Sequence, residues 1–506
     1  MTLSRLAHIC RWMRGLLSLA VLACAPAWAQ QSGFERLPLP PELSPEAMNP
    51  EAVAPNVMAD PSGADRFLID LTTALRLADR ANPEIGISRQ EIEVSLALLQ
   101  RARVILLPSL TAGSNYHNHT GNLQRSGGTI LSVDSQLLYY GGGAQAIGAN
   151  TVMVPAIRIF AHVGDAYFEP LAARQQTVVR RFDAGATFNT ILLNVSMRYV
   201  ELMAAEAQLE LLRRSQQDAA ESVRITSDFA RVGQGRAADA NRMLTAAALI
   251  DSEVQRWLEQ KAVAAAELAR LLSLDPSAGL ATVGGPMPLL QLVDPACRLD
   301  QLLDVALRQR PDLAARTAMI AETETRYRQE RMRPLLPTIS VSASAGEFGG
   351  GSNLVVPTFG SFSGRTDFDA FAYWSLQNAG VGNLALWRNR RALADQAISD
   401  RTRVVNLVRR QVAEAYAEAT AGRETVDTNE KRLQLAEAGF AEELRRIRGG
   451  EGLPIELLDN LNRLVNARQA LVASISSYDQ AEFRLFVALG QAPPAMLPAG
   501  QAVLGR

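Results

Sequence analysis

The sequence predicts a mostly α-helical protein with a membrane β part, built from long coiled-coil helical hairpins and about four β-strands per chain. Three observations support this prediction. The chain contains the same pattern twice, which indicates duplication. Each copy has a proline-free stretch long enough for a very long helix. Each copy also has a segment in which apolar and polar residues alternate, as they do along a strand with two unlike faces.

The N-terminus has the features of a secretory signal peptide. Basic residues precede the apolar run GLLSLAVLACA, and a small-x-small cleavage pattern then ends at Ala29. The run is too short to remain as a membrane span, which takes about 20 apolar residues. We therefore expect residues 1–29 to be removed. In an alternative interpretation, VLAC at 21–24 is a lipobox and Cys24 becomes a lipidated N-terminus. Both interpretations place the mature chain outside the cytoplasm.

Composition argues against several classes of protein. The formal net charge is -1, which is not the charge of a nucleic-acid-binding protein with a basic face. Of the three cysteines only Cys297 follows Ala29, so packing rather than an intramolecular disulfide is expected to hold the fold. The mature chain has no apolar run long enough for a membrane-spanning helix. Barrel strands alternate and give no such run, so a β-barrel remains compatible.

The duplication defines the expected domains. Residues 30–66 carry seven prolines and are expected to form an extended arm, either a strap along the body or a linker. Two repeats follow at 67–280 and 299–495, joined by a linker at 281–298 and followed by a tail at 496–506. Their later parts correspond at a constant offset of 217 residues, as these pairs show: Tyr199 and Tyr416, Glu201 and Glu418, Gly233 and Gly450, Asp239 and Glu456, Leu244 and Leu461, Leu268 and Leu485, Pro276 and Pro493.

Each repeat is expected to contain a long helical hairpin, at about 187–275 and about 384–490. A helix from 187 to 232 would span roughly 70 Å, and one from 384 to 448 roughly 100 Å. The first has a narrow apolar seam, which predicts coiled-coil packing: Leu192, Val195, Tyr199, Leu202, Ala205, Leu209 and Leu212. Each long helix ends at glycine, in VGQGRAAD and RGGEGLPIE, where glycine permits a left-handed cap and Pro454 suits a new first turn.

Strands are expected before each hairpin, at about 109–168 and about 338–377. Apolar residues alternate with serines in TISVSASA, and TDFDAFAYWSL has Phe368, Ala370, Ala372, Trp374 and Leu376 on one face. The glycine-rich GGGAQAIG and GEFGGGSN are expected to connect strands, since they lack the lysine and the helix of a phosphate loop. Four strands would leave unpaired edges in lipid, so several chains would have to close one barrel together.

This order of segments resembles the TolC family of outer-membrane efflux proteins over nearly all of residues 67–495. The resemblance rests on RANPEI and RQRPDL, on LLPSL and LLPTI, and on FARVGQGRAAD and LRRIRGGEGLPIELLD. It implies a homotrimer whose chains share a twelve-stranded barrel in outer-membrane lipid and whose helices form a periplasmic tunnel. It also implies a passive exit duct of a tripartite efflux or secretion system, with a periplasmic adaptor (membrane fusion) protein and an inner-membrane transporter as partners.

The same resemblance supplies the candidate site residues. Glu456 and Asp459, six and nine positions after Gly450, are expected to form a pore constriction. Their first-repeat equivalents are Asp239 and Arg242. The alternative is a plain helix start, where acids are favoured by about 0.3 to 1 kcal/mol.

The expected tips for adaptor docking are Gly233, Asp239, Gly450 and Gly452, and the first and third of these also suit structural caps. The turns depart from the family pattern. Arg236 and Leu453 stand where serine or threonine is common, and Gly452 is an additional glycine.

Other motifs do not indicate chemistry. His117 and His119 form an HxH beside a turn, and we expect an exposed loop there, because His162 is the one further histidine of the mature chain and a metal site would lack ligands. No HExxH, GxSxG or catalytic cysteine pattern is present, so neither an enzyme nor a cofactor is expected. The alternative class is a soluble periplasmic coiled-coil adaptor or scaffold without a barrel. The strand alternation after Pro108 and Pro337 argues against it.

Overall fold

The computed structural model describes residues 58–59, 67–147, 151–283, 287–356 and 358–494. The expected signal peptide, Cys24, most of the proline-rich arm and the C-terminal tail lie outside these residues. Within the described part, no helix combines the length and apolar composition needed to cross a membrane.

Each repeat starts with a helix broken before a proline, as predicted. Their bounds are Leu71–Ala81 (α2) and Pro83–Arg103 (α3) in the first repeat, and Leu299–Gln309 (α6) and Pro311–Met332 (α7) in the second. At the first break, the Asn82 side chain caps α3 by accepting a hydrogen bond from the backbone N–H of Glu84 at 2.9 Å. Proline occupies the first helical position after both breaks, where its missing N–H is not needed.

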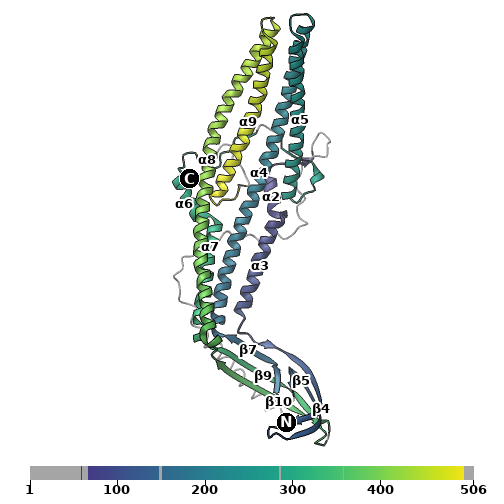
Figure 1. The fold of residues 1–506 in the computed structure, drawn as a ribbon, viewed down its shortest axis with the longest axis vertical. Helices are drawn as coiled ribbons and strands as arrows, with labels where there is room; N and C mark the ends of the chain where they lie inside the picture. Colours follow the sequence, from purple (N-terminus) through teal and green to yellow (C-terminus); the bar gives the residue numbers. More distant parts are fainter. Residues whose placement is uncertain (1–57, 60–66, 148–150, 284–286, 357, 495–506) are drawn as a thin grey trace. The chain divides into compact units, whose positions relative to one another are not determined.

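The long hairpins are present in both repeats (Figure 1). They consist of Val163–Arg231 (α4) with Ala237–Leu271 (α5), and Val381–Arg448 (α8) with Pro454–Ala488 (α9). All seven residues of the predicted apolar seam on α4 are buried. α4 begins well before the expected residue 187 and includes the buried Pro170. Its first turns are held to α7 by the ion pairs Asp165–Arg333 and Glu169–Arg326, so tertiary contacts outweigh the cost of the proline.

The helices pack in one constant order. Next to the strands the order is α3, α4, α7, α8, and toward the hairpin tips it is α5, α4, α9, α8 (Figure 1). α4 and α8 therefore belong to both levels. Toward the tips, α5 takes the place of α3 and α9 takes the place of α7. The helices enclose two buried apolar clusters. One surrounds Leu202, Leu268 and Val408 and also includes residues of α2, α6 and α9, and the other surrounds Met243, Ile447 and Leu461 nearer the tips.

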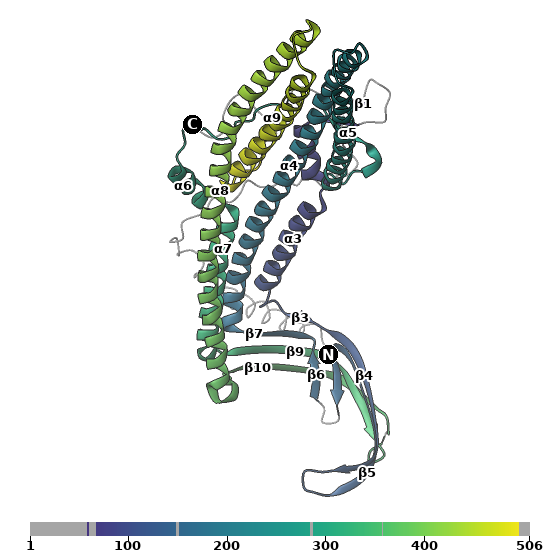
Figure 2. The same ribbon diagram turned by 45° about the horizontal axis from the view of Figure 1, so that its top comes forward.

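The main sheet contains four lanes that lie side by side (Figure 2). A lane here means one strand, or two strands that continue each other end to end. Its strands are Ser109–Leu110 (β3), Ala112–Gln124 (β4), Ile130–Ile147 (β5), Thr151–Pro155 (β6), Ile157–His162 (β7), Thr338–Ser352 (β9) and Gly360–Tyr373 (β10). β9 pairs with β7 through its first half and with β5 through its second, so β5 and β7 form one lane. β3 and β4 likewise form one lane, which pairs with β7 and β5. The order is β3/β4, β5/β7, β9, β10, and neighbouring lanes are antiparallel. The prediction of four strands is confirmed.

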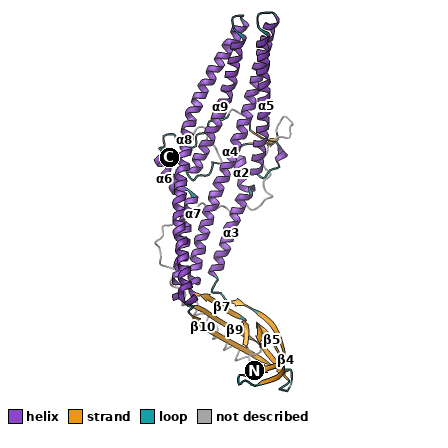
Figure 3. Cartoon of the chain, in the orientation of Figure 1, coloured by secondary structure: helices purple, strands orange, loops and turns teal. Residues whose placement is uncertain are grey.

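The prediction that the glycine-rich segments connect strands is wrong. GGGAQAI lies in β5 and the glycines of GEFGGGS lie in β9 (Figure 3). Glycine is needed there because the backbones come very close. A Cβ on Gly350 would lie 2.0 Å from the carbonyl oxygen of Gln136, and one on Gly141 would lie 2.6 Å from the Cα of Gly346. The strands of the first repeat end at His162, where β7 stops, and not at the expected residue 168.

A small sheet and a buried acidic pair hold the joint between the repeats. Met58–Ala59 (β1), Phe67–Ile69 (β2) and Leu280–Thr282 (β8) form the sheet. Past it, Asp479 of α9 accepts a hydrogen bond from the N–H of Leu290 at 2.8 Å, and Glu482 accepts from Leu292 at 2.8 Å. Two carboxylates thus fix an extended segment that has few hydrogen bonds of its own.

Candidate channel wall and hairpin tips

One face of the main sheet is apolar across three lanes. The register places Phe368, Ala370 and Ala372 of β10 opposite Ala343, Val341 and Ile339 of β9. On the other side of β9, the same three residues pair with Ile157, Ile159 and Ala161 of β7. The alternation predicted from each strand separately therefore adds up to a continuous surface, on which Phe368 is 70% exposed. An apolar surface of this kind is typical of the lipid-facing side of a barrel wall.

The opposite face of the sheet carries polar side chains together with the exposed Phe160 and Phe371. It carries Ser340, Ser342 and Ser344 of β9, all three buried. Ser342 pairs with Arg158 on one side and with Asp369 on the other. Nearby, Arg365 forms an ion pair with Asp367 at 2.8 Å. A wall with this polarity separates hydrocarbon from water.

The chain has the same two open edges at every level. In the sheet, the outer lanes are β3/β4 and β10. The helices that continue these lanes are α3 and α8, and toward the tips α5 takes the place of α3. Large apolar side chains are exposed along both edges: Ile87, Val94 and Leu98 on α3, Leu249 and Val263 on α5, and Ile398 and Leu435 on α8. Two unlike edges that run the full length of a chain suit head-to-tail association of identical copies.

The two hairpin tips have the same backbone fold. In the first, the carbonyl oxygen of Phe229 accepts hydrogen bonds from the N–H groups of Gln234 and Gly235, both at 3.0 Å. In the second, Arg446 accepts in the same way from Glu451 at 3.0 Å and Gly452 at 3.2 Å. These residues correspond at the offset of 217, so Gly452 is the counterpart of Gly235 and not an additional residue.

Glycine is required in the tips for two different reasons. Gly233 and Gly450 have φ of 77° and 81°, the left-handed conformation that closes a helix, and open space surrounds both. At Gly452 the reason is space, since a Cβ would lie 2.7 Å from Oε1 of Glu443 and 2.8 Å from the backbone nitrogen of Ile447.

The side chains of the tips differ. Glu456 lies in the first turn of α9, 3.6 Å from the guanidinium of Arg446, which also contacts Glu443 at 2.9 Å. Asp459 pairs with Arg463 at 2.9 Å, and both side chains are more than half exposed. In the first tip, Asp239 is paired internally with Arg242 at 3.1 Å, and Phe229 occupies the position of Arg446. An acidic pair therefore belongs to the second tip alone, as the sequence indicated.

The sequence did not single out Glu443 and Arg446. Glu443 is only 4% exposed, and its Oε1 has no hydrogen-bond partner among the described residues. It stands in a run of charged residues, EELRRIR, in which only the i, i+3 spacing to Arg446 hints at a pair. Glu443 is buried because α9 folds back over it, and this contact cannot be predicted from the residues next to Glu443 in the sequence.

The expectation of an exposed loop at His117 and His119 is wrong. Both lie in β4, opposite Leu137 and Ser135 of β5, and both are half-buried on one face of the strand. The loop falls later, after Gln124. Among the described residues, no three His, Cys, Asp or Glu side chains come together as a metal site.

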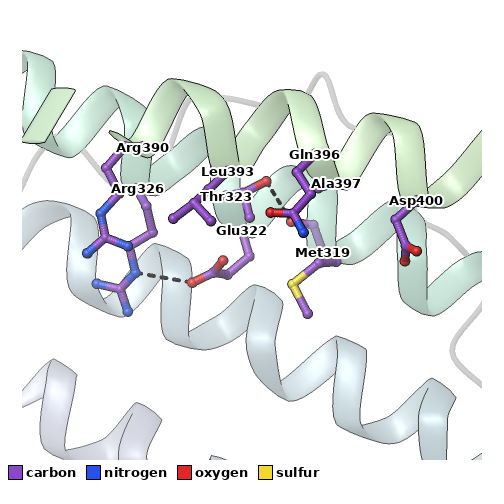
Figure 4. Close-up of a pocket in the computed structure, with 9 residues that line it drawn as sticks. All are labelled: Met319, Glu322, Thr323, Arg326, Arg390, Leu393, Gln396, Ala397 and Asp400. Carbon is purple, nitrogen blue, oxygen red and sulfur yellow. Dashed lines mark hydrogen bonds and ion pairs between the residues drawn. The ribbon is translucent and has the colours of Figure 1, made fainter. Parts of the chain in front are cut away.

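A groove of about 270 Å³ lies between α7 and α8 (Figure 4). It is lined by Met319, Glu322, Thr323, Arg326, Arg390, Leu393, Gln396, Ala397 and Asp400. Arg326 is held there by Glu322 at 3.1 Å. Burial acts to lower the pKa of its guanidinium, but the hydrogen bonds and attraction of Glu169 and Glu322 outweigh burial and raise that pKa. The lining pairs charges and includes neither histidine nor cysteine, so it offers no nucleophile with an adjacent base.

Comparison with known proteins agrees with this architecture. Residues 302–491 match the sequence model of the family described as outer membrane efflux protein. The outer membrane protein VceC from Vibrio cholerae is 15% identical, with 83% of this chain and 96% of that chain covered at a TM-score of 0.65. A membrane protein from Pseudomonas aeruginosa is 20% identical, with 88% and 99% covered at 0.69. The CmeC outer membrane channel from Campylobacter jejuni is 14% identical, with 83% and 85% covered at 0.67. No curated protein sequence matches significantly.

The fold is therefore that of the outer-membrane channels. The second repeat is an outer membrane efflux protein domain, and the resemblance to the TolC family is confirmed in domain and fold. The expected location in the outer membrane agrees with this family, whose members are channels rather than enzymes.

Proposed function

We propose that the protein is the trimeric exit duct of a tripartite efflux or secretion system. It conducts substrates passively from an inner-membrane pump across the periplasm and the outer membrane. The observation that carries this proposal is the pair of open edges that the sheet and both helical levels share. A single contact between copies would cover all three levels at once.

The strand directions support closure of a ring. β4 runs away from the helices and β10 runs back toward them, because α3 precedes the first lane and α8 follows the last. A neighbour's β4 beside β10 would therefore be antiparallel, like every pair within the chain. Closure would remove both unpaired edges, which lipid requires.

The number of lanes favours three copies. Two copies would give about eight lanes, and side chains fill the interior of a barrel of that size. Three give about twelve, the smallest ring that leaves room for a passage. The polar face with Arg158, Ser342 and Asp369 would then line the passage, and the apolar face with Phe368 would meet lipid.

The hairpin tips would form the far end of the tunnel. There Gly233, Asp239, Gly450 and Gly452 would meet the periplasmic adaptor and the inner-membrane transporter. Glu456 and Asp459 of three chains would bring six carboxylates around one axis. Their mutual repulsion would be relieved by cations or water, which makes the ring a constriction for charged solutes.

Cross-linking tests the edge contact directly. In a Cys297→Ser background, we would introduce Val94→Cys on α3 and Ile398→Cys on α8, which lie on opposite edges. Before oxidation, outer-membrane fractions should contain heat-modifiable trimers, and oxidation should make these trimers covalent. The matched control, Ile398→Cys with Leu435→Cys, has both thiols on one edge and should give no covalent trimer. Release as soluble protein by osmotic shock would reject the duct and favour the adaptor or scaffold.

A further inference from the structure

Three polar side chains occupy consecutive inward positions on β4. Asn115, His117 and His119 are two residues apart, so they lie on one face with about 7 Å between successive Cα atoms. Exposure alternates along this strand, and these three are half-buried while their neighbours are exposed. They lie on the same face of the sheet as Ser342 and Ser344. Asn115 is opposite Tyr139, and Tyr139 is opposite Phe348. Phe348 lies an even number of residues after the two serines on β9, and therefore on their face.

Two atoms of this row lack partners among the described residues. They are Oδ1 of Asn115 and Nε2 of His119, both buried. Buried polar atoms are nearly always satisfied, and the two residues are about 14 Å apart along the strand, so Nε2 of His119 calls for a partner of its own, which His117 is close enough to share. His162 of β7 provides the contrast. Its Nδ1 accepts a hydrogen bond from Gly164 at 3.0 Å, and its Nε2 lies 3.1 Å from the carbonyl oxygen of Arg333.

The chemistry of the row selects the ligand. Imidazole nitrogens are ligands for Cu²⁺, Ni²⁺ and Zn²⁺, and water can complete the coordination. Ca²⁺ and Mg²⁺ are disfavoured because they require carboxylates, and none of the three residues has one. Each metal–nitrogen bond is about 2.0 to 2.1 Å, so the two rings must lean toward each other across one strand interval. Adjacent positions could not do this, since their side chains point to opposite faces.

We propose that His117 and His119 bind one divalent transition-metal ion per chain on the inward face of the sheet, with Cu²⁺ held most tightly. The order of metals follows from the general affinity of nitrogen ligands, which peaks at copper. The site itself depends only on β4. Its position on the wall of the passage rests on the proposed function.

The test is Cu²⁺ titration of the detergent-purified full chain, followed by calorimetry and by electron paramagnetic resonance. We expect one Cu²⁺ per chain with a two-nitrogen signature. His119→Asn should weaken binding by about 100-fold, because two linked ligands gain that much from effective concentration.

The matched control changes position without changing composition. His117→Asn with Asn118→His turns HNH into NHH and moves one imidazole to the other face of the strand. This variant should lose tight binding as His119→Asn does, and heat-modifiable mobility would confirm that each variant has folded. Equal Cu²⁺ affinity in the exchanged variant and the parent would overturn the proposal, and so would a one-nitrogen signal in the parent.

The outcomes separate this site from the duct. Loss of the metal site with normal trimers would leave the duct proposal intact. Chains that bind Cu²⁺ through both histidines yet fail to form trimers would instead reject the duct and keep the site.

Discussion

Arg446 at the end of α8 reaches Glu456 at the start of α9, with 3.6 Å between the guanidinium nitrogen and the carboxylate oxygen. The same nitrogen contacts the buried Glu443 at 2.9 Å. One cation therefore joins the two helices of the second hairpin across its turn. The first hairpin has Phe229 and Thr226 at the equivalent positions and no such link.

Arg446→Phe should loosen the second tip. Glu443 would keep a buried carboxylate without its cation, at a cost of about 1 to 3 kcal/mol. Hydrogen exchange of the amides at 449–453, measured by mass spectrometry, should become faster. Adding Glu443→Thr gives this tip the residues of the first and should restore slow exchange. Equal exchange in the single variant and the parent would show that Arg446 does not close the tip.

Glu456→Ala with Asp459→Ala should change ion conduction. Removing six carboxylates from the proposed ring should raise single-channel conductance and abolish block by divalent cations in planar bilayers. Asp239→Ala is the matched control, because it removes the equivalent acid of the first tip, where Arg242 stands in place of Asp459. If conductance and block stayed as in the parent, the two acids would be a plain helix start.

Gly450→Val should impair export while trimers still form. The residue has φ of 81°, which costs a residue with a side chain about 1 to 2 kcal/mol, and the distortion stays within the tip. Accumulation of an exported dye in cells measures the loss, and heat-modifiable mobility reports the trimer. A fully active variant would remove Gly450 from the docking surface.

The two faces of the sheet can be tested with one substitution on each. Phe368→Lys places a charge on the apolar face, at a cost of about 2 to 4 kcal/mol if that face meets the middle of the bilayer. Phe371→Lys makes the same change three residues later on the polar face. The first should lower the amount of trimer in the outer membrane and the second should not. Equal loss in both would contradict the assignment of faces.

Asp479→Asn should alter how stability depends on pH. Burial raises the pKa of Asp479 from 3.8 to about 8. Burial also raises the pKa of the neighbouring Glu482. The folded state thus binds protons that the unfolded state has released. The stabilisation is complete below pH 3.8 and is lost as the pH rises toward 8.

In the Asp479→Asn variant, the amide oxygen can still accept the hydrogen bond from Leu290. We expect the slope of Tm against pH between 4 and 8 to become shallower, with a higher Tm than the parent above pH 8. Any dependence of Tm on pH that remains in this variant is assigned to Glu482. Adding Glu482→Gln should remove it and is the control. Superimposable profiles for parent and Asp479→Asn would exclude a protonated carboxyl at this position.

The seam of α4 and the apolar alternation of β10 were predictable because burial on one side imposes a period on the sequence itself. The role of Gly350 and the start of α4 were mispredicted because both depend on partners distant in the chain. Gly350 is fixed by the approach of Gln136, and Pro170 is tolerated because ion pairs hold its helix. The burial of Glu443 has the same origin, since the turn brings α9 over it.

α4 and α8 run unbroken from the strands to the tips, whereas α5 and α9 are separate helices of 35 residues each. At 1.5 Å per residue, each return helix is a lever of about 50 Å. A tilt of about 6° at its inner end would carry the tip about 5 Å. In the proposed duct, sub-ångström repacking around Leu268 or Leu485 would be amplified into a change in aperture, while the long helices α4 and α8 stay fixed.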